Sequence, residues 1–393
     1  MATSLAIIIL GGVLLNFIFE KFKLPGLLGM LILGIILGPY GFNLISSDLL
    51  TISADIRKIA LIIILLRAGF GIKKSDLIDV GKPAIKMSFI PGILEGLSIA
   101  IISTKLLGFT FIQGGILGFI IAAVSPAVVV PQMINLMETN LGTNKGIPTL
   151  ILAGASIDDI FAITILTSFL GLYSGSKINL VGQIFSIPTS IILGILLGLF
   201  LGFVLIKLFK ALSIPDTKKL LLILSFAILL TVLETLLKDN ISIASLLGVM
   251  TIGFILTEKT PKIAKSLSLS FNKLWIFAEI MLFVLVGAEV NIHIAFSSGA
   301  LGLIIIFAGL LFRSIGVMLS LLGTDLNLKE KFFCVISYVP KATVQAAMGA
   351  LPLSLGVASG DIILAISVLS IIVTAPLGAM AMKYFSKKLL FQS

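Results

Sequence analysis

The chain has 393 residues, of which 58% are hydrophobic and only 12% are charged, and its mean hydropathy is +1.22. Because a soluble domain carries about 25% charged residues, this composition excludes a water-soluble globular protein and indicates a membrane protein with many spans. A single cysteine, Cys334, and a single histidine, His293, exclude a disulfide framework and metal sites built from several thiolates or imidazoles. No hydrophilic segment is long enough for a second, soluble domain.

Apolar segments follow one another along the whole chain. A helix crosses the hydrocarbon core with about 20 apolar residues, so we expect an all-α polytopic membrane protein in which 1–393 form one unit of thirteen transmembrane helices. The first segment has no basic residue before it, which favours a span over a secretory signal peptide. The predicted spans are 4–19, 24–39, 56–71, 83–103, 110–137, 146–172, 180–209, 218–236, 242–257, 272–290, 297–321, 331–353 and 362–384.

The basic residues indicate how these helices are oriented. With the N-terminus outside, 20 of the 28 Lys and Arg residues fall in inner segments, and 3 lie within spans. The outer segments hold the remaining 5, which are Arg57, Lys58, Lys105, Lys177 and Lys238. Because cytoplasmic segments are enriched in Lys and Arg, we expect the N-terminus outside and the C-terminus inside. The net charge of +10 is then a topology signal and not a nucleic-acid footprint, and the absence of a targeting segment favours the cell (inner) membrane.

Five ionisable residues lie far from the ends of their spans, in chain order Glu95, Asp158, Asp159, Arg313 and Lys341. Their distance from the inner span ends is roughly 12–18 Å at 1.5 Å per residue, close to the midplane of a core about 30 Å thick. A charge at that depth costs about 2.5–3.5 kcal/mol and survives by pairing or by facing water. A structural ion network and an ion-transport site are the two interpretations.

Two further charges carry weaker signals. Arg67 lies about one turn from the inner end of its span, so we expect its side chain to snorkel to the interface. Glu279 lies two turns into its span near Trp275, which leaves packing, a dimer contact and an ion pathway open.

Two spans contain helix breaks at matched depth. The motif A-V-S-P-A-V-V-V-P begins at residue 123 and breaks the helix at Pro126, and Y-V-P-K-A-T-V-Q begins at residue 338 and breaks it at Pro340. The spans are seven apart in order, so they run in opposite directions, as in the inverted repeats of secondary transporters. Broken helices expose carbonyls and amides that suit a cation. We expect Ser125 and Thr343 to line such a site.

The segments VSPAVVVPQM, GASIDDIFAI and VPKATVQAAMGALPL together resemble signatures of the cation–proton antiporter superfamily, most closely the NHA branch of sodium/proton antiporters. LLRAGFGI and FAEIMLFVLVGAEV fit the same pattern. The resemblance implies the antiporter fold with crossed broken helices, and elevator-like alternating access in a homodimer. It implies a core ion-transport subdomain of spans 83–172 and 297–384, with the other spans mainly in a dimerisation scaffold.

The resemblance also implies roles for single residues. Asp159 matches the principal ion-binding carboxylate, Asp158 its partner in the Na⁺ site, and Glu95 and Arg313 a structural ion pair. Lys341 matches the lysine of the second crossing helix. Since adjacent helical residues point about 100° apart, we expect Asp159 to face a water-filled cavity and Asp158 to face Lys341.

The expected function is exchange of Na⁺ or Li⁺ for H⁺, with no cofactor beyond these transported ions and no partner beyond the bilayer and a second copy. We expect electrogenic exchange, because a lysine pairs with the aspartates, although the resemblance associates an arginine at 313 with electroneutral relatives. The alternative is a sodium-coupled symporter of an organic anion, of the bile-acid-carrier kind. An intramembrane protease is excluded because its metal, Ser–His or separated-aspartate motifs are absent, and a channel would need a continuous polar stripe.

Overall fold

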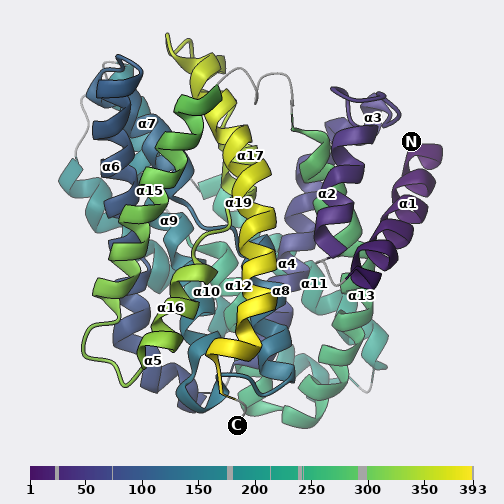
Figure 1. Ribbon diagram of the computed structural model, residues 1–393. Coiled ribbons are helices and arrows are strands. Elements are labelled where there is room, and N and C mark those ends of the chain that lie inside the picture. The colour runs from purple at the N-terminus through teal and green to yellow at the C-terminus, as the bar shows by residue number, and fades with distance from the viewer. Residues whose placement is uncertain are drawn as a thin grey trace.

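The computed structural model describes residues 1–22, 26–72, 74–174, 180–212, 214–237, 241, 243–290 and 299–391, without the side chains of 75–79 and 180–187. Within these ranges every regular element is a helix (Figure 1). Five residues used in the sequence argument lie outside the described residues, namely Lys23, Lys73, Lys177, Lys238 and His293.

The helices up to the first broken span occupy the N-terminal third of the chain. They are α1 (Ala2–Lys21), α2 (Gly26–Leu37), α3 (Ser47–Thr51), α4 (Ser53–Gly71), α5 (Lys74–Met87), α6 (Ile90–Leu106), α7 (Phe111–Ala122) and α8 (Pro126–Glu138). A short turn, η1 (Thr143–Lys145), leads into the helix that carries both aspartates. The later helices are α9 (Ile147–Tyr173), α10 (Leu180–Ala211), α11 (Asp216–Leu237), α12 (Ser245–Lys259), α13 (Pro261–Ala288), α15 (Gly299–Ser320), α16 (Leu328–Ser337), α17 (Thr343–Met348), α18 (Leu351–Ser354) and α19 (Gly360–Leu389).

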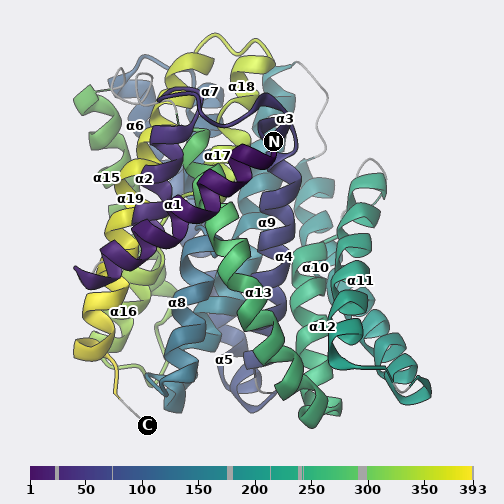
Figure 2. The same ribbon diagram turned by 90° about the vertical axis from the view of Figure 1, so that its right-hand side faces the viewer.

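All thirteen predicted spans fall on helices, but they do not all qualify as spans on their own. Among the described residues, nine segments are long and apolar enough to cross a membrane. The other four predictions fall on α2, α4, α12 and the pair α16 and α17, which are shorter, more charged or interrupted. The count of thirteen and the orientation therefore stay predictions, although the two chain ends lie at opposite ends of the bundle, as an odd number requires (Figures 1 and 2).

One predicted span is interrupted, and one predicted boundary was wrong. The span predicted at 83–103 lies within one candidate span, Val80–Leu106, in which α5 and α6 are separated at Ser88 and Phe89 just before Pro91. The span predicted to begin at 272 begins at Pro261 as the first turn of α13. Lysines in this first part of α13 lower its hydropathy, but lysine is a good helix former, so the helix continues beyond the apolar segment.

The helices pack as two groups. In one, α6 packs against α7 and α15, and α9 against α5, α7 and α8; in the other, α12 packs against α4 and α10, and α13 against α2 and α4. The groups meet where α4 contacts α8 and α10 contacts α9. Figure 1 shows α6 and α15 at one side of the bundle and α1 and α2 at the other, and Figure 2 shows α1 lying obliquely across α2.

Glycines permit the closest helix approaches within each group. A Cβ added at Gly118 of α7 would lie 2.2 Å from the Gly96 carbonyl oxygen of α6, and one at Gly287 of α13 would lie 2.2 Å from the Leu31 oxygen of α2. Small residues allow helix backbones to pack this closely in a membrane, so these glycines permit the close approach of α6 to α7 and of α2 to α13.

Candidate functional site

The two broken helices cross at their breaks. Helix α7 ends at Ala122 and α8 begins at Pro126, and α16 ends at Ser337 before α17 begins at Thr343. The backbone N–H of Ser125 donates to the Pro340 carbonyl oxygen at 2.9 Å, which joins one break to the other. The interruptions at Pro126 and Pro340 therefore lie where the sequence predicts them.

The free carbonyls at the end of α7 are capped by side chains from other helices. Gln345 is buried, and its Nε2 donates to the carbonyl oxygens of Ile120, Ile121 and Ala123 at 2.9, 3.3 and 2.9 Å. Arg313 donates to the Ala122 oxygen, and Lys341 Nζ lies 3.4 Å from it. The last carbonyls of a helix have no partner within the helix and carry partial negative charge, so an amide and two cations stabilise this end.

Four of the five mid-membrane charges form one buried network. Arg313 Nη1 donates to Glu95 Oε2 at 2.6 Å and Arg313 Nη2 to Asp158 Oδ2 at 3.0 Å, while Lys341 Nζ donates to Glu95 Oε2 at 2.7 Å. The backbone N–H of Val124 adds a hydrogen bond of 2.9 Å to Asp158 Oδ2. Each of the four side chains is at most 2% exposed. Two acids balance two bases, as buried charges require.

Lys341, the predicted neighbour of Asp158, lies close enough for its charge to act on that carboxylate but is not its ion-pair partner. Lys341 pairs with Glu95 of α6, and Asp158 pairs with Arg313 of α15. The long lysine side chain extends past the crossing to α6, whereas Asp158 faces α15 and the first break. The rotation of each helix decides these pairs, and span depth does not encode that rotation. The predicted pair of Glu95 and Arg313 is present at 2.6 Å.

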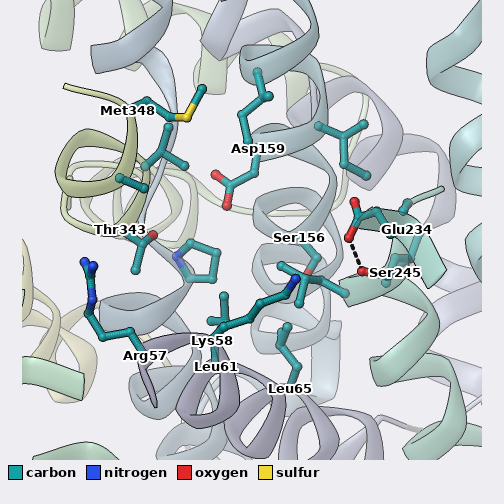
Figure 3. A pocket seen from close by; sticks show the side chains of 18 of the residues that line it. Arg57, Lys58, Leu61, Leu65, Ser156, Asp159, Glu234, Ser245, Thr343 and Met348 are labelled. Carbon is teal, nitrogen blue, oxygen red and sulfur yellow. Dashed lines mark hydrogen bonds between the residues drawn. The ribbon is translucent and has the colours of Figure 1, made fainter. Parts of the chain in front are cut away.

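Asp159 lies outside this network and borders a cavity of about 370 Å³ (Figure 3). Asp159 and Thr343 point towards the same space, which Pro126 also lines. The cavity reaches the residues that begin α4 and α12 and those near the end of α11, at the end of the bundle that topology predicts outside. Its polar and charged lining residues are Arg57, Lys58, Ser156, Asp159, Thr164, Ser190, Glu234, Ser245 and Thr343.

Several oxygens at the crossing have no hydrogen-bond partner among the described residues. They are Ser125 Oγ, Asp158 Oδ1, Asp159 Oδ1, Thr343 Oγ1 and Gln345 Oε1. Leaving a buried polar atom unpaired costs about 1–3 kcal/mol, so such a set of acceptors needs an explanation. Hard cations are bound by carboxylate, hydroxyl and carbonyl oxygens, and these atoms belong to that chemical class.

Sequence reasoning missed two residues at the crossing. The ring of Tyr338 lies 5.2 Å from the Arg313 guanidinium, and Thr374 Oγ1 accepts a 2.8 Å hydrogen bond from the Lys341 backbone N–H. Tyr338 directly precedes the Val-Pro-Lys motif, which was the available signal. Thr374 lies within the apolar helix α19 and carries no signal of its own.

The Arg67 side chain is mostly buried by neighbouring helices. Its side chain is 10% exposed, its Nε donates to Asn272 Oδ1 at 2.5 Å, and its guanidinium lies 5.9 Å from the Trp275 ring centre. Glu138 of α8 approaches it at 3.8 Å. Glu279 accepts a hydrogen bond from Trp275. Arg67 is therefore held between α4, α8 and α13.

Comparison with known proteins identifies the family. Residues 5–387 match the family described as the transmembrane sodium/hydrogen exchangers. The chain belongs to the sodium/hydrogen exchanger family. Sodium/hydrogen exchanger 9B2 of Mus musculus is 33% identical over 388 residues, which cover 94% of this chain and 69% of that protein. Sodium/hydrogen exchanger 9B1 of Homo sapiens is 32% identical over 400 residues, covering 97% of this chain and 76% of that protein.

A solved structure shares the fold of this exchanger-family chain. The sodium proton antiporter MjNhaP1 from Methanocaldococcus jannaschii superposes with a TM-score of 0.78 at 23% identity, covering 98% of this chain and 97% of that chain. The family match and this fold confirm the resemblance to cation–proton antiporters and the multi-pass helical architecture. The names of the relatives are those of exchangers, which fits a transporter and not an enzyme.

Proposed function

We propose that this exchanger-family protein exchanges Na⁺ or Li⁺ for H⁺ at Asp159. The observation that carries the proposal is the contrast at the crossing. Asp158 is tied to Arg313 and to a backbone N–H, whereas Asp159 borders the cavity and forms no ion pair among the described residues. An ionised carboxylate beside unpaired hydroxyl oxygens binds a small hard cation, and the same oxygens bind a proton.

Competition for one carboxylate gives obligatory exchange. With Na⁺ or H⁺ bound, Asp159 is neutralised, and its helix can move relative to the scaffold without carrying an uncompensated charge through a low-dielectric region. With neither bound, the charge opposes that movement. Asp158 Oδ1 lies close to the same crossing and is proposed as a second ligand, with Ser125 and Thr343 hydroxyls completing the set.

The stoichiometry of exchange depends on whether a residue of the buried network gains or loses a proton during transport. Electrogenic exchange, as expected from the sequence, requires Asp158 or Lys341 to give up a proton during the cycle. The ion pairs of Arg313 with Asp158 and of Lys341 with Glu95 favour a network that stays charged throughout. One titrating carboxylate then exchanges one cation for one proton. A membrane potential imposed with valinomycin distinguishes the two ratios. A faster rate of exchange supports electrogenic exchange, and an unchanged rate supports the one-for-one ratio.

The core and scaffold division, the homodimer and the cell (inner) membrane location are also proposals. Two packing groups that meet at α4 with α8 and at α9 with α10 support a division into a moving core and a static scaffold. The resemblance to antiporters supports the homodimer.

Proteoliposome transport tests the central proposal. Asp159→Asn keeps the size of the side chain and removes its charge, and we expect Na⁺- or Li⁺-driven proton flux to fall to the level of protein-free liposomes. Glu258→Gln, on the exposed end of α12 away from the cavity, is the matched control. Flux retained by Asp159→Asn would refute the assignment. Flux that requires an added organic anion would favour the symporter instead.

A further inference from the structure

The cavity holds a second carboxylate that the exchange site does not use. Glu234 lies near the end of α11 and lines the same cavity as Asp159 (Figure 3). Its neighbours Leu229, Val232, Leu233 and Leu236 are exposed apolar residues of the kind that face lipid. A charged residue in this apolar helix that turns to a cavity indicates a functional role.

The immediate partner of Glu234 is a hydroxyl and not a base. Ser245, at the start of α12, donates its hydroxyl hydrogen bond to Glu234 Oε2. Among the described residues Glu234 forms no ion pair. Lys58, on α4, lines the same cavity close enough for its charge to act on Glu234. The carboxylate is therefore oriented but retains oxygens that face the cavity.

The other base at this end of the cavity is already neutralised. Arg57 donates through both terminal nitrogens to the Glu289 carboxylate, one of these bonds being 2.9 Å. With that pair balanced, the remaining charges that line the cavity are Lys58, Glu234 and Asp159. When both carboxylates are ionised, the cavity carries a net negative charge between apolar walls. Clefts of this kind concentrate cations.

We propose that Glu234 recruits the incoming monovalent cation at the mouth of the cavity, before the cation reaches Asp159. The proposal rests on the exchange function proposed above. Glu234 and the Ser245 oxygen contact a cation that keeps part of its water shell, and Asp159 then takes it at the crossing. Lys58 opposes this step because its ammonium group is a tethered competitor for the same carboxylate. Glu234 is thus a positioning residue that sets the apparent affinity from one side of the membrane.

The proposal predicts that the KM for Na⁺ changes on one side of the membrane only. Glu234 and Lys58 lie on α11 and α4, in the helix group that packs around α12, and not on the helix that carries Asp159. Recruitment therefore acts only on the face to which this cavity opens. A cleft lined by negative charge raises the local cation concentration by about tenfold or more. For one carboxylate with a lysine nearby, we expect the KM for Na⁺ on that face to rise about three- to tenfold in Glu234→Gln, with kcat unchanged.

The first test compares variants that remove the negative charge of Glu234 or the positive charge of Lys58. Lys58→Gln should lower the same KM, whereas Glu258→Gln should leave it at the wild-type value. KM measured from the opposite face should not change in any of the three variants. Equal KM values for Glu234→Gln and wild type would overturn the recruitment role. If Asp159→Asn still abolishes flux, the exchange function stands without it.

Chemical restoration of the charge supplies the second test and separates charge from shape. Glu234→Cys is treated with membrane-impermeant methanethiosulfonates that add either a sulfonate or a trimethylammonium group. We expect the anionic adduct to lower KM towards the wild-type value and the cationic adduct to raise it. The native thiol of Cys334 is fully buried, so the wild-type chain treated in the same way is the control. Equal effects of the two adducts would mean that Glu234 only packs, and would overturn the proposal.

Discussion

Asp158 and Asp159 are joined by one peptide bond but belong to two different regions of the molecule. Asp158 is 1% exposed and lies in a network of four charges drawn from α6, α9, α15 and the second break. Asp159 faces a cavity that reaches the end of the bundle. A buried carboxylate held in an ion pair stabilises the fold and keeps only its free oxygen available as a ligand, whereas a carboxylate without an ion pair that borders a cavity can bind and release an ion. Two adjacent residues of one helix therefore present an acid with a largely structural role and an exchangeable one.

The largest expected effect separates the two aspartates. Asp159→Asn should abolish cation-driven proton flux while leaving the thermal unfolding midpoint of the purified protein close to wild type, since Asp159 forms no ion pair among the described residues. Asp158→Asn should lower both the flux and the unfolding midpoint, because it leaves Arg313 with one carboxylate fewer. Flux assays in proteoliposomes and melting curves in detergent measure the two quantities. Identical behaviour of the two variants would erase the distinction.

Arg313→Ala should destabilise the protein by about 3–5 kcal/mol, because it leaves Asp158 as an uncompensated buried charge and leaves Glu95 with Lys341 as its remaining partner. Denaturant unfolding in detergent measures the loss. Arg313→Lys is the informative control, since an ammonium group keeps the charge but lacks the fork that reaches two carboxylates, and it should recover part of the stability. An unfolding free energy equal to wild type in Arg313→Ala would contradict the network's role.

Competition at Asp159 predicts how Na⁺ affinity depends on pH. Protons and Na⁺ bind the same carboxylate, so lowering the pH raises the apparent KM for Na⁺. In the range where the proton is bound, the rise should be about tenfold per pH unit for one-for-one competition. Saturating Na⁺ should restore the maximal rate. Measurement of initial rates over Na⁺ concentration and pH checks this, and a falling maximal rate at constant KM would indicate separate sites.

The smallest expected effect concerns the cap on α7. Gln345→Leu removes the amide that donates to three carbonyls and should cost about 1–3 kcal/mol of stability through unpaired backbone groups. Gln113→Leu removes the capping-box amide at the start of α7, and its cost is the comparison for loss of a side-chain amide at the other end of that helix. Equal stability of both variants would mean that the carbonyls find other partners.

Much of the fold could be predicted because membrane insertion leaves strong local signals. The length of the apolar segments predicted the helices, and Pro126 and Pro340 predicted the interruptions. The energetic cost of a charge in lipid singled out five residues: Glu95, Asp158, Asp159, Arg313 and Lys341. The two errors in helix ends have one physical cause. The start of α13 and the break between α5 and α6 depend on hydrogen bonding and packing at span ends, where hydropathy does not discriminate.

The amino-acid sequence alone was sufficient to select five charges and two helix breaks at one depth, because depth follows from counting residues along a helix. Apart from the pair of Glu95 and Arg313, which the family resemblance implies, it could not select their partners, since a pair depends on the rotation of each helix and on the reach of each side chain. Only the tertiary structure shows that Lys341 pairs with Glu95 and that Gln345 caps the carbonyls of α7. It also shows that Asp159 borders the cavity, with Glu234 across it. Contacts between residues more than a hundred positions apart are decided by packing, and that is where this site acquires its chemistry.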